Sequence, residues 1–182
     1  MDEQSALLKD IAERLDKGGI RYMLTGSVAL ALYAAPRMTR DLDIVIDIGG
    51  GDAARVAALF EKDCYIDRAE VEDAARRRGM FNAIHRESLI KVDCIVRKDE
   101  PYRNMEFSRR LRIDLEGVPL WVVAPEDLLL SKLLWARDAE SQLQMKDAFA
   151  IAASVRGLDW KYVFEWADAL GVRDLAEKVK EG

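Results

Sequence analysis

Histidine and cysteine are scarce in this chain of 182 residues, in which His85 is the only histidine and Cys64 and Cys94 are the only cysteines. The two cysteines lack the spacing of metal ligands, and one pair does not make a disulfide framework. These shortages argue against a zinc site and against a disulfide-stabilised scaffold. No apolar run approaches the roughly 20 residues that a membrane-spanning helix needs, and the acidic start Met-Asp-Glu-Gln is unlike a signal peptide. We therefore expect a cytoplasmic protein that does not associate with membranes.

An excess of positive charge is also lacking, because 28 Lys and Arg residues are outnumbered by 33 Asp and Glu residues, for a net charge of −5. This balance argues against a protein that coats nucleic acid. Residues 68–112 are the exception, with 12 basic residues against 8 acidic ones. Such a segment is typical of a surface that binds an RNA acceptor or an NTP, or else of a solvated helix face with ion pairs. For Arg76 to Arg78 we favour the ion-paired face.

The length and the periodicity of the apolar residues indicate one α/β (α+β) unit. We expect a mixed β-sheet flanked by helices in residues 1–123, the core, and a C-terminal helical bundle in residues 124–182 that packs on it. The expected strands are 20–24, 41–48, 64–66, 80–85, 88–96, 111–115 and 118–123. The expected helices are 8–17, 28–35, 52–61, 69–77, 101–110, 125–137, 141–155, 159–170 and 173–180.

Two carboxylates stand two residues apart at the start of one expected strand. Asp41 and Asp43 alternate with Leu42, Ile44 and Ile46, a pattern typical of a strand with one buried face. Residues i and i+2 of a strand lie on the same face about 6.5 to 7 Å apart, so both carboxylates reach into one small space. A divalent cation such as Mg²⁺ would explain this pair; the alternative is the solvated face of an edge strand.

A turn suited to phosphate precedes this pair. The short apolar strand ends in Thr25-Gly26-Ser27, and a helix of good helix formers follows. Glycine lets the backbone approach a phosphate closely, and a helix N-terminus offers free N–H groups to an anion. The alternative is an ordinary strand-to-helix turn with Ser27 as the N-cap.

A third carboxylate, Asp93, lies in the later apolar strand, on the face opposite Val92 and Cys94. If this strand neighbours the strand of Asp41, three carboxylates converge on one site. The alternative is an aspartate that is neutralised by a neighbouring Lys or Arg. Because the rest of the strand is apolar, we favour the functional interpretation.

Taken together, Gly26-Ser27, an interval of thirteen residues, Asp41-Leu-Asp43-Ile and Asp93 resemble the signature of the polymerase-beta-type nucleotidyltransferase superfamily. The resemblance covers residues 20–97 and implies a role for each of these residues. Gly26 and Ser27 would hold the triphosphate, Asp41 and Asp43 would bind two Mg²⁺ ions, and Asp93 would activate the acceptor hydroxyl. We include Asp93 as a third candidate metal ligand, and Mn²⁺ as an alternative ion.

Further basic residues extend this resemblance toward small bacterial nucleotidyltransferases, which include abortive-infection toxin relatives and aminoglycoside nucleotidyltransferases. Arg37 and Arg40 precede the acidic pair and would contact phosphates. Lys132, in a leucine-rich helix, would stabilise charge on the β- and γ-phosphates. Lys132 has two other interpretations, a surface residue that snorkels to water and a partner of Asp147 in the Lys146-Asp147 pair of the next helix.

The expected activity is the Mg²⁺-dependent transfer of a nucleoside monophosphate from an NTP to an acceptor hydroxyl, with release of pyrophosphate. RNA such as tRNA, a small molecule and a protein hydroxyl are all candidate acceptors. Two other classes of function stay open: an NTP-binding module of the same fold without turnover, and an interaction protein of a toxin–antitoxin pair. A cognate antitoxin or a second copy of the chain is the expected protein partner.

Overall fold

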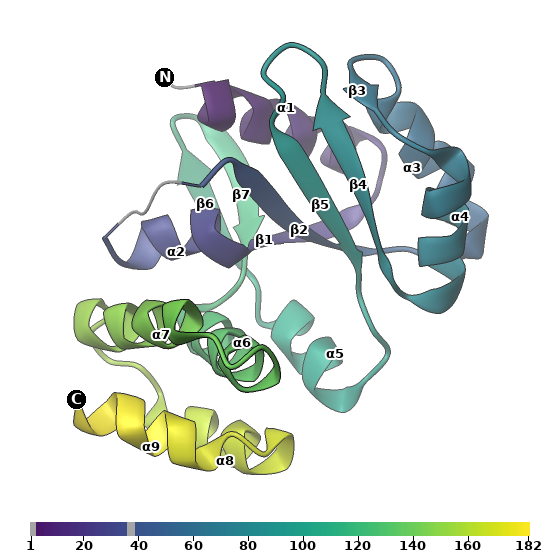
Figure 1. Cartoon of the computed structure of the whole chain (residues 1–182). Coiled ribbons are helices and arrows are strands. Elements are labelled where there is room, and N and C mark those ends of the chain that lie inside the picture. The colour runs from purple at the N-terminus through teal and green to yellow at the C-terminus, as the bar shows by residue number, and fades with distance from the viewer. Residues whose placement is uncertain (1–2, 36–38) are drawn as a thin grey trace.

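The computed structural model describes residues 3–35 and 39–182 and contains one mixed sheet with helices on both faces (Figure 1). Seven strands form the sheet in the order β3-β4-β5-β2-β1-β7-β6. The strands are β1 (Arg21–Thr25), β2 (Asp41–Asp47), β3 (Cys64–Tyr65), β4 (Met80–His85), β5 (Lys91–Val96), β6 (Leu111–Leu115) and β7 (Val118–Val122). The pairs β2–β5 and β1–β7 are parallel, and the other neighbours are antiparallel. The predicted mixed α/β sheet is confirmed.

The helices follow the predicted order closely. They are α1 (Glu3–Lys17), α2 (Gly26–Tyr33), α3 (Ala53–Phe60), α4 (Arg68–Arg77), α5 (Pro101–Ser108), α6 (Pro125–Asp138), α7 (Gln142–Ser154), α8 (Trp160–Leu170) and α9 (Arg173–Glu181), with a 3₁₀ turn, η1 (Gly50–Asp52). In Figure 1, α1 passes behind the strands, α3 and α4 lie at the right beside β3 and β4, and α6 to α9 form a group below the sheet. None of the helices in the described segments combines the length and apolarity that a membrane crossing requires.

Alternation along β2 determines which face of the sheet carries the polar residues. Leu42, Ile44 and Ile46 are buried, whereas the intervening positions are exposed or half-buried. The apolar set therefore packs into the core beneath the sheet, together with apolar residues of α1 and α3. The opposite face of β2 carries the aspartates, and α2 contacts β1 and β2 as well as α6 and α7. This arrangement brings the first helix after β1 and the C-terminal helices to the same side as the aspartates.

Candidate active site

The turn between β1 and α2 is built around Gly26. This residue has φ +67°, and a Cβ atom added to it would lie 2.0 Å from Asp43 Oδ2. Glycine is therefore required here for two reasons: a left-handed backbone and the close approach of the Asp43 carboxylate. The side chain of Thr25 precedes the helix at the N-cap position. The interpretation of Ser27 as the N-cap is therefore wrong, because Ser27 is the second residue of α2.

The backbone N–H of Ser27 donates a hydrogen bond to the Asp43 carboxylate. One of the N–H groups at the start of α2 is thus already used by a protein carboxylate. A helix N-terminus attracts anions through such groups, and here Asp43 is the anion that it attracts. A phosphate at this turn would share or displace that contact.

The register of the sheet places Asp93 beside Asp43. The strands β2 and β5 are parallel, with Asp43 opposite Asp93 and Asp41 opposite Lys91. Neighbouring strands lie about 4.8 Å apart, so the two carboxyl groups project side by side from the same face. The convergence of the three carboxylates required that these two strands be neighbours, and they are, so aspartates from segments about fifty residues apart in the chain meet on one face.

The three aspartates differ in exposure. Asp41 is exposed and Asp43 is half-buried, whereas Asp93 is 8% exposed. Asp93 Oδ2 lies 2.9 Å from Lys91 Nζ, so the predicted alternative of an aspartate neutralised by a nearby Lys holds for this oxygen. Asp93 Oδ1 is buried and makes no hydrogen bond within the described residues. A buried oxygen without a partner is costly and marks a position where a ligand would be stabilised.

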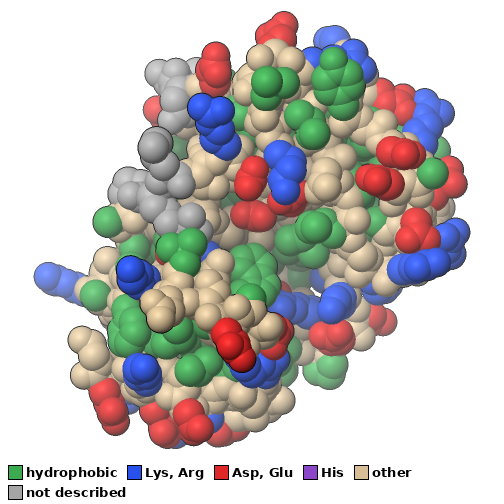
Figure 2. Space-filling view, in the orientation of Figure 1, with side chains coloured by type: hydrophobic (Ala, Val, Ile, Leu, Met, Phe, Trp, Pro, Cys, Tyr) green, Lys and Arg blue, Asp and Glu red, His purple; other side chains and the backbone are tan. Residues whose placement is uncertain are grey.

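Burial raises the pKa of the Asp43 carboxyl above its usual value, and the negative charges of Asp93 and Asp41 raise it further. The positive charge of Lys132 and the hydrogen bond from Ser27 oppose this shift. The raised pKa therefore reflects a half-buried carboxylate that the fold keeps close to other negative charges. A bound cation would relieve that repulsion. Figure 2 shows acidic and basic side chains next to each other over the middle of the sheet.

Within residues 3–35 and 39–182, no three His, Cys, Asp or Glu side chains are grouped closely enough to hold a metal ion. The three aspartates thus lie on neighbouring strands without forming a complete set of metal ligands. Mg²⁺ is commonly bound by one or two carboxylates together with substrate phosphates, so a closed cage is not needed for that ion. Such a partial site fits the residues present: the aspartates offer carboxylate oxygens, Asp93 Oδ1 makes no hydrogen bond to a described residue, and Gly26 leaves the space beside Asp43 free of a side chain.

Lys132 lies in α6, is fully buried, and its Nζ lies 2.7 Å from Asp147 Oδ2 in α7. The predicted pairing with Asp147 is confirmed, and the interpretation as a snorkelling surface residue is wrong because the leucine-rich helix is buried on that face. Lys132 also acts electrostatically on Asp43. The C-terminal helices thus bring a buried cation toward the aspartates, while the neighbouring Lys146 is exposed.

The two arginines predicted to contact phosphates lie just before β2. Arg37 is outside the described residues. Arg40 is exposed and directly precedes Asp41. At the far end of β2, Ile48 and Gly49 lead into η1.

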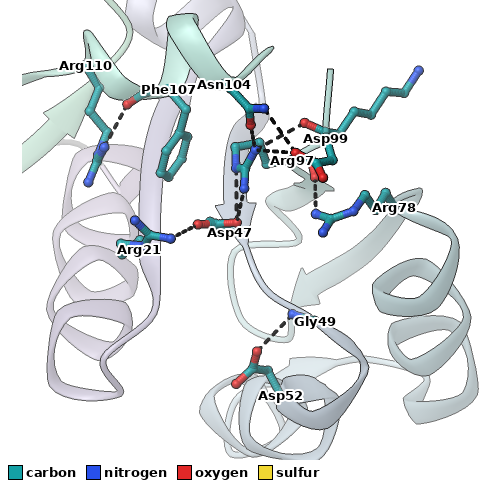
Figure 3. Close-up of polar contacts among 11 residues, drawn as sticks. Arg21, Asp47, Gly49, Asp52, Arg78, Arg97, Asp99, Asn104, Phe107 and Arg110 are labelled. Carbon is teal, nitrogen blue, oxygen red and sulfur yellow. Dashed lines mark hydrogen bonds and ion pairs between the residues drawn. The ribbon is translucent and has the colours of Figure 1, made fainter. Parts of the chain in front are cut away.

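The basic segment is largely neutralised by ion pairs. Arg97 binds Asp47 through Nε at 3.0 Å and also donates to Asn104, and Arg78 donates to the carbonyl oxygen of Arg97 (Figure 3). Arg76 and Arg77 both pair with Asp73. The ion-paired interpretation of that helix face is therefore confirmed for these two residues.

Lys91 is a site residue to which the sequence assigned no role. Its sequence signal was the alternation Lys91-Val92-Asp93, which places the lysine and the aspartate on one face of the strand. Only the pairing of β5 with β2 shows that this lysine also stands opposite Asp41.

A family model described as "Nucleotidyl transferase AbiEii toxin, Type IV TA system" matches residues 9–154. No curated protein sequence is significantly similar to the chain.

Solved structures of similar fold include an antigenic nucleotidyltransferase-like protein from Paracoccidioides brasiliensis, with TM-score 0.64 and 15% identity over 99% of this chain and 93% of that one. ANT(2″)-Ia in complex with adenylyl-2″-tobramycin has TM-score 0.64 and 16% identity over 95% and 99% of the two chains. Lincosamide antibiotic adenylyltransferase LnuA, lincomycin-bound, has TM-score 0.55 and 11% identity over 85% and 99%. At these identities the likeness is one of fold.

Proposed function

The chain belongs to the AbiEii family of nucleotidyltransferase toxins, and from this premise we propose that it transfers a nucleoside monophosphate from an NTP to an acceptor hydroxyl, with Mg²⁺ as cofactor and pyrophosphate as the second product. The observation that carries this proposal is the side-by-side placement of Asp43 and Asp93 in register, next to the Gly26 turn. A fold gains no stability from two like charges placed so close together. A reaction that needs a cation and a base explains them.

In the proposed reaction, Asp93 takes the proton of the acceptor hydroxyl through Oδ1, the buried oxygen that makes no hydrogen bond to a described residue. The acceptor oxygen then forms a bond to the α-phosphorus of the NTP. The bond from that phosphorus to the β-phosphate oxygen breaks, and pyrophosphate leaves with the electron pair. General base catalysis requires such a group within hydrogen-bond reach of the hydroxyl.

The other residues of the site position charge. Asp41 and Asp43 supply the carboxylate oxygens that would hold Mg²⁺, which when bound neutralises phosphate charge and orients the phosphate oxygens. Lys132, held by Asp147, directs a fixed positive charge toward the same side. The Gly26-Ser27 turn and the exposed Arg40 would contact the triphosphate, and we extend this proposal to Arg37. Phosphoryl-type transfer gains mainly from positioning and charge neutralisation.

The proposal includes the division of the chain into a catalytic core, residues 1–123, and a helical region, residues 124–182, that completes the site through Lys132. It leaves three acceptor classes to be separated by experiment: RNA such as tRNA, a small molecule, and a protein hydroxyl. Two relatives by fold are named for antibiotics, which supports including small molecules. The family name supports a cognate antitoxin as the genetic partner.

The test is a transfer assay with each NTP labelled at either the α- or the γ-phosphate, in the presence of Mg²⁺ and a cell extract. We expect α-label to appear in an acceptor fraction and γ-label to leave as pyrophosphate. The fraction of RNA, protein or small molecules that carries the label identifies the acceptor. Asp43→Asn and Asp93→Asn should each lower the rate at least 100-fold, on the scale of lost acid–base or electrostatic catalysis.

Three results would contradict the proposal. Retention of γ-label by the acceptor would indicate phosphoryl transfer instead. Asp43→Asn with the wild-type rate would remove the aspartates from the mechanism. Tight NTP binding in a calorimetric titration, without any labelled product, would favour a binding module.

A further inference from the structure

Lys91 lies at the edge of the aspartate site with its charge turned inward. It is the first residue of β5, and its Nζ lies 2.9 Å from Asp93 Oδ2. The side chain of Lys91 is 38% exposed, whereas that of Asp93 is 12% exposed. A flexible side chain in contact with water thus neutralises a carboxylate that is nearly buried.

The sheet register makes Lys91 a neighbour of the other two aspartates as well. Lys91 stands opposite Asp41 on the parallel strand, and its period of two along β5 places it on the face of Asp93 and Asp43. The charges of all three aspartates attract the Lys91 ammonium. The Lys91 ammonium is therefore stabilised by the negative charge of the whole aspartate site.

The other lysine near these aspartates is differently placed. Lys132 is buried and held 2.7 Å from Asp147, a carboxylate of α7 that is not one of the three aspartates of the site. Within the described residues, Lys91 forms its ion pair with Asp93, which belongs to the site, and with no carboxylate elsewhere. Its ammonium therefore neutralises charge that belongs to the site itself.

We propose that Lys91 is a built-in counter-ion of the aspartate site: it holds Asp93 in the metal-free protein and competes with a divalent cation for the negative charge of Asp41, Asp43 and Asp93. Binding of the cation releases the ammonium from Asp93 Oδ2 toward solvent, where the exposed side chain has room to move. Lys91 is thus a positioning residue that sets the affinity of the site for the ion. This inference rests on the proposed function for the identity of the ion.

The test is a calorimetric titration of the full chain with Mn²⁺, at one pH and one ionic strength, for wild type and Lys91→Met. Methionine keeps an unbranched side chain, one atom shorter than that of lysine, and removes the charge. We expect Lys91→Met to bind Mn²⁺ about fivefold more tightly, which corresponds to the worth of one partly exposed ion pair. Lys91→Gln, which keeps a polar end, should show the same gain.

Two variants serve as matched controls. Lys98→Met removes one positive charge from an exposed position just beyond the other end of β5, and its Mn²⁺ affinity should stay within twofold of wild type. Lys91→Arg keeps the charge and should also stay close to wild type. An affinity of Lys91→Met and Lys91→Gln that is unchanged or weaker than wild type would overturn the proposal, as would an equal gain in Lys98→Met.

A second measurement needs neither metal nor turnover. In EDTA, Lys91→Met should unfold at a lower temperature than Lys98→Met, because the three aspartates then repel one another without a counter-ion. Equal unfolding temperatures would overturn the proposal. The proposed function can fail without this inference. If the wild-type protein transfers no nucleotide but Lys91→Met still binds Mn²⁺ more tightly than wild type, the counter-ion proposal stands and the proposed reaction does not. If neither protein binds Mn²⁺, the competition with a cation is wrong.

Discussion

Replacement of Gly26 by alanine tests the packing on which the whole site depends. The new Cβ would lie 2.0 Å from Asp43 Oδ2 and 2.6 Å from its Cγ, and Gly26 has φ +67°. A left-handed backbone costs an alanine about 1 to 2 kcal/mol, and forcing an atom into filled space typically costs about 1 to 3 kcal/mol more. We therefore expect Gly26→Ala to lower the free energy of unfolding by about 2 to 5 kcal/mol.

Gly171 supplies a control with nearly the same backbone. It has φ +68°, and its added Cβ would meet Arg137 at 3.6 Å, an ordinary contact. Gly171→Ala should therefore cost only the backbone part, about 1 to 2 kcal/mol. Urea denaturation followed by circular dichroism measures both values. An equal loss in the two variants would refute the argument that the contact with Asp43 excludes a side chain at position 26.

A double variant separates the contact from the backbone strain. Asp43→Ala removes the two carboxyl atoms nearest to the new Cβ but leaves the Asp43 Cβ position, 2.8 Å away. In that background Gly26→Ala should cost less by about 1 kcal/mol or more, as expected for coupled neighbours. Additive losses would show that the side chains do not meet.

Two further predictions concern the charges around the site. Asp43→Asn should stabilise the fold at pH 7, because the raised pKa of Asp43 means that its ionisation disfavours the native state. The gain in stability over wild type should shrink as the pH falls through that pKa. Unfolding curves at pH 7 and pH 4.5 measure this change, and a gain that grew in acid would contradict the argument. Lys132→Met should cost about 3 to 5 kcal/mol, because it leaves Asp147 buried without its cation. The double variant Lys132→Met/Asp147→Leu should recover most of this loss in thermal unfolding, and a double variant no more stable than Lys132→Met would contradict the pairing argument.

Local patterns predicted most of the secondary structure because each signal acts within a few residues. The alternation from Asp41 onward predicted β2, and the structure ends that strand one residue earlier, at Asp47. Ser141 stands at the start of the helix predicted over 141–155, and its side chain caps α7 by accepting a hydrogen bond from the Gln144 N–H. Gly171, in the left-handed region, ends α8. Caps and periodicity are local, and the sequence displays them directly.

The partners of buried charges could not be predicted in the same way. Lys132 had three interpretations, because a lysine in a leucine-rich helix gives no sign of which way it faces. The packing of α6 against α7 decides in favour of Asp147. Likewise, the use of the Ser27 N–H by Asp43 depends on how closely the turn approaches β2. Such contacts arise from tertiary packing, to which a single sequence is nearly silent.

The position of the aspartates depends on both local sequence patterns and tertiary packing. Asp43 and Asp93 become neighbours only because the chain between β2 and β5 forms α3, β3, α4 and β4 before it returns to pair in parallel with β2. Each aspartate alone is compatible with a solvated strand, and their proximity opposes folding. The protein nevertheless retains half-buried Asp43 beside Asp93, places a glycine where any side chain would displace the first, and holds the second with Lys91. Three separate segments thus carry a cost in stability, and the proposed chemistry of the site supplies a reason for it that the fold alone does not.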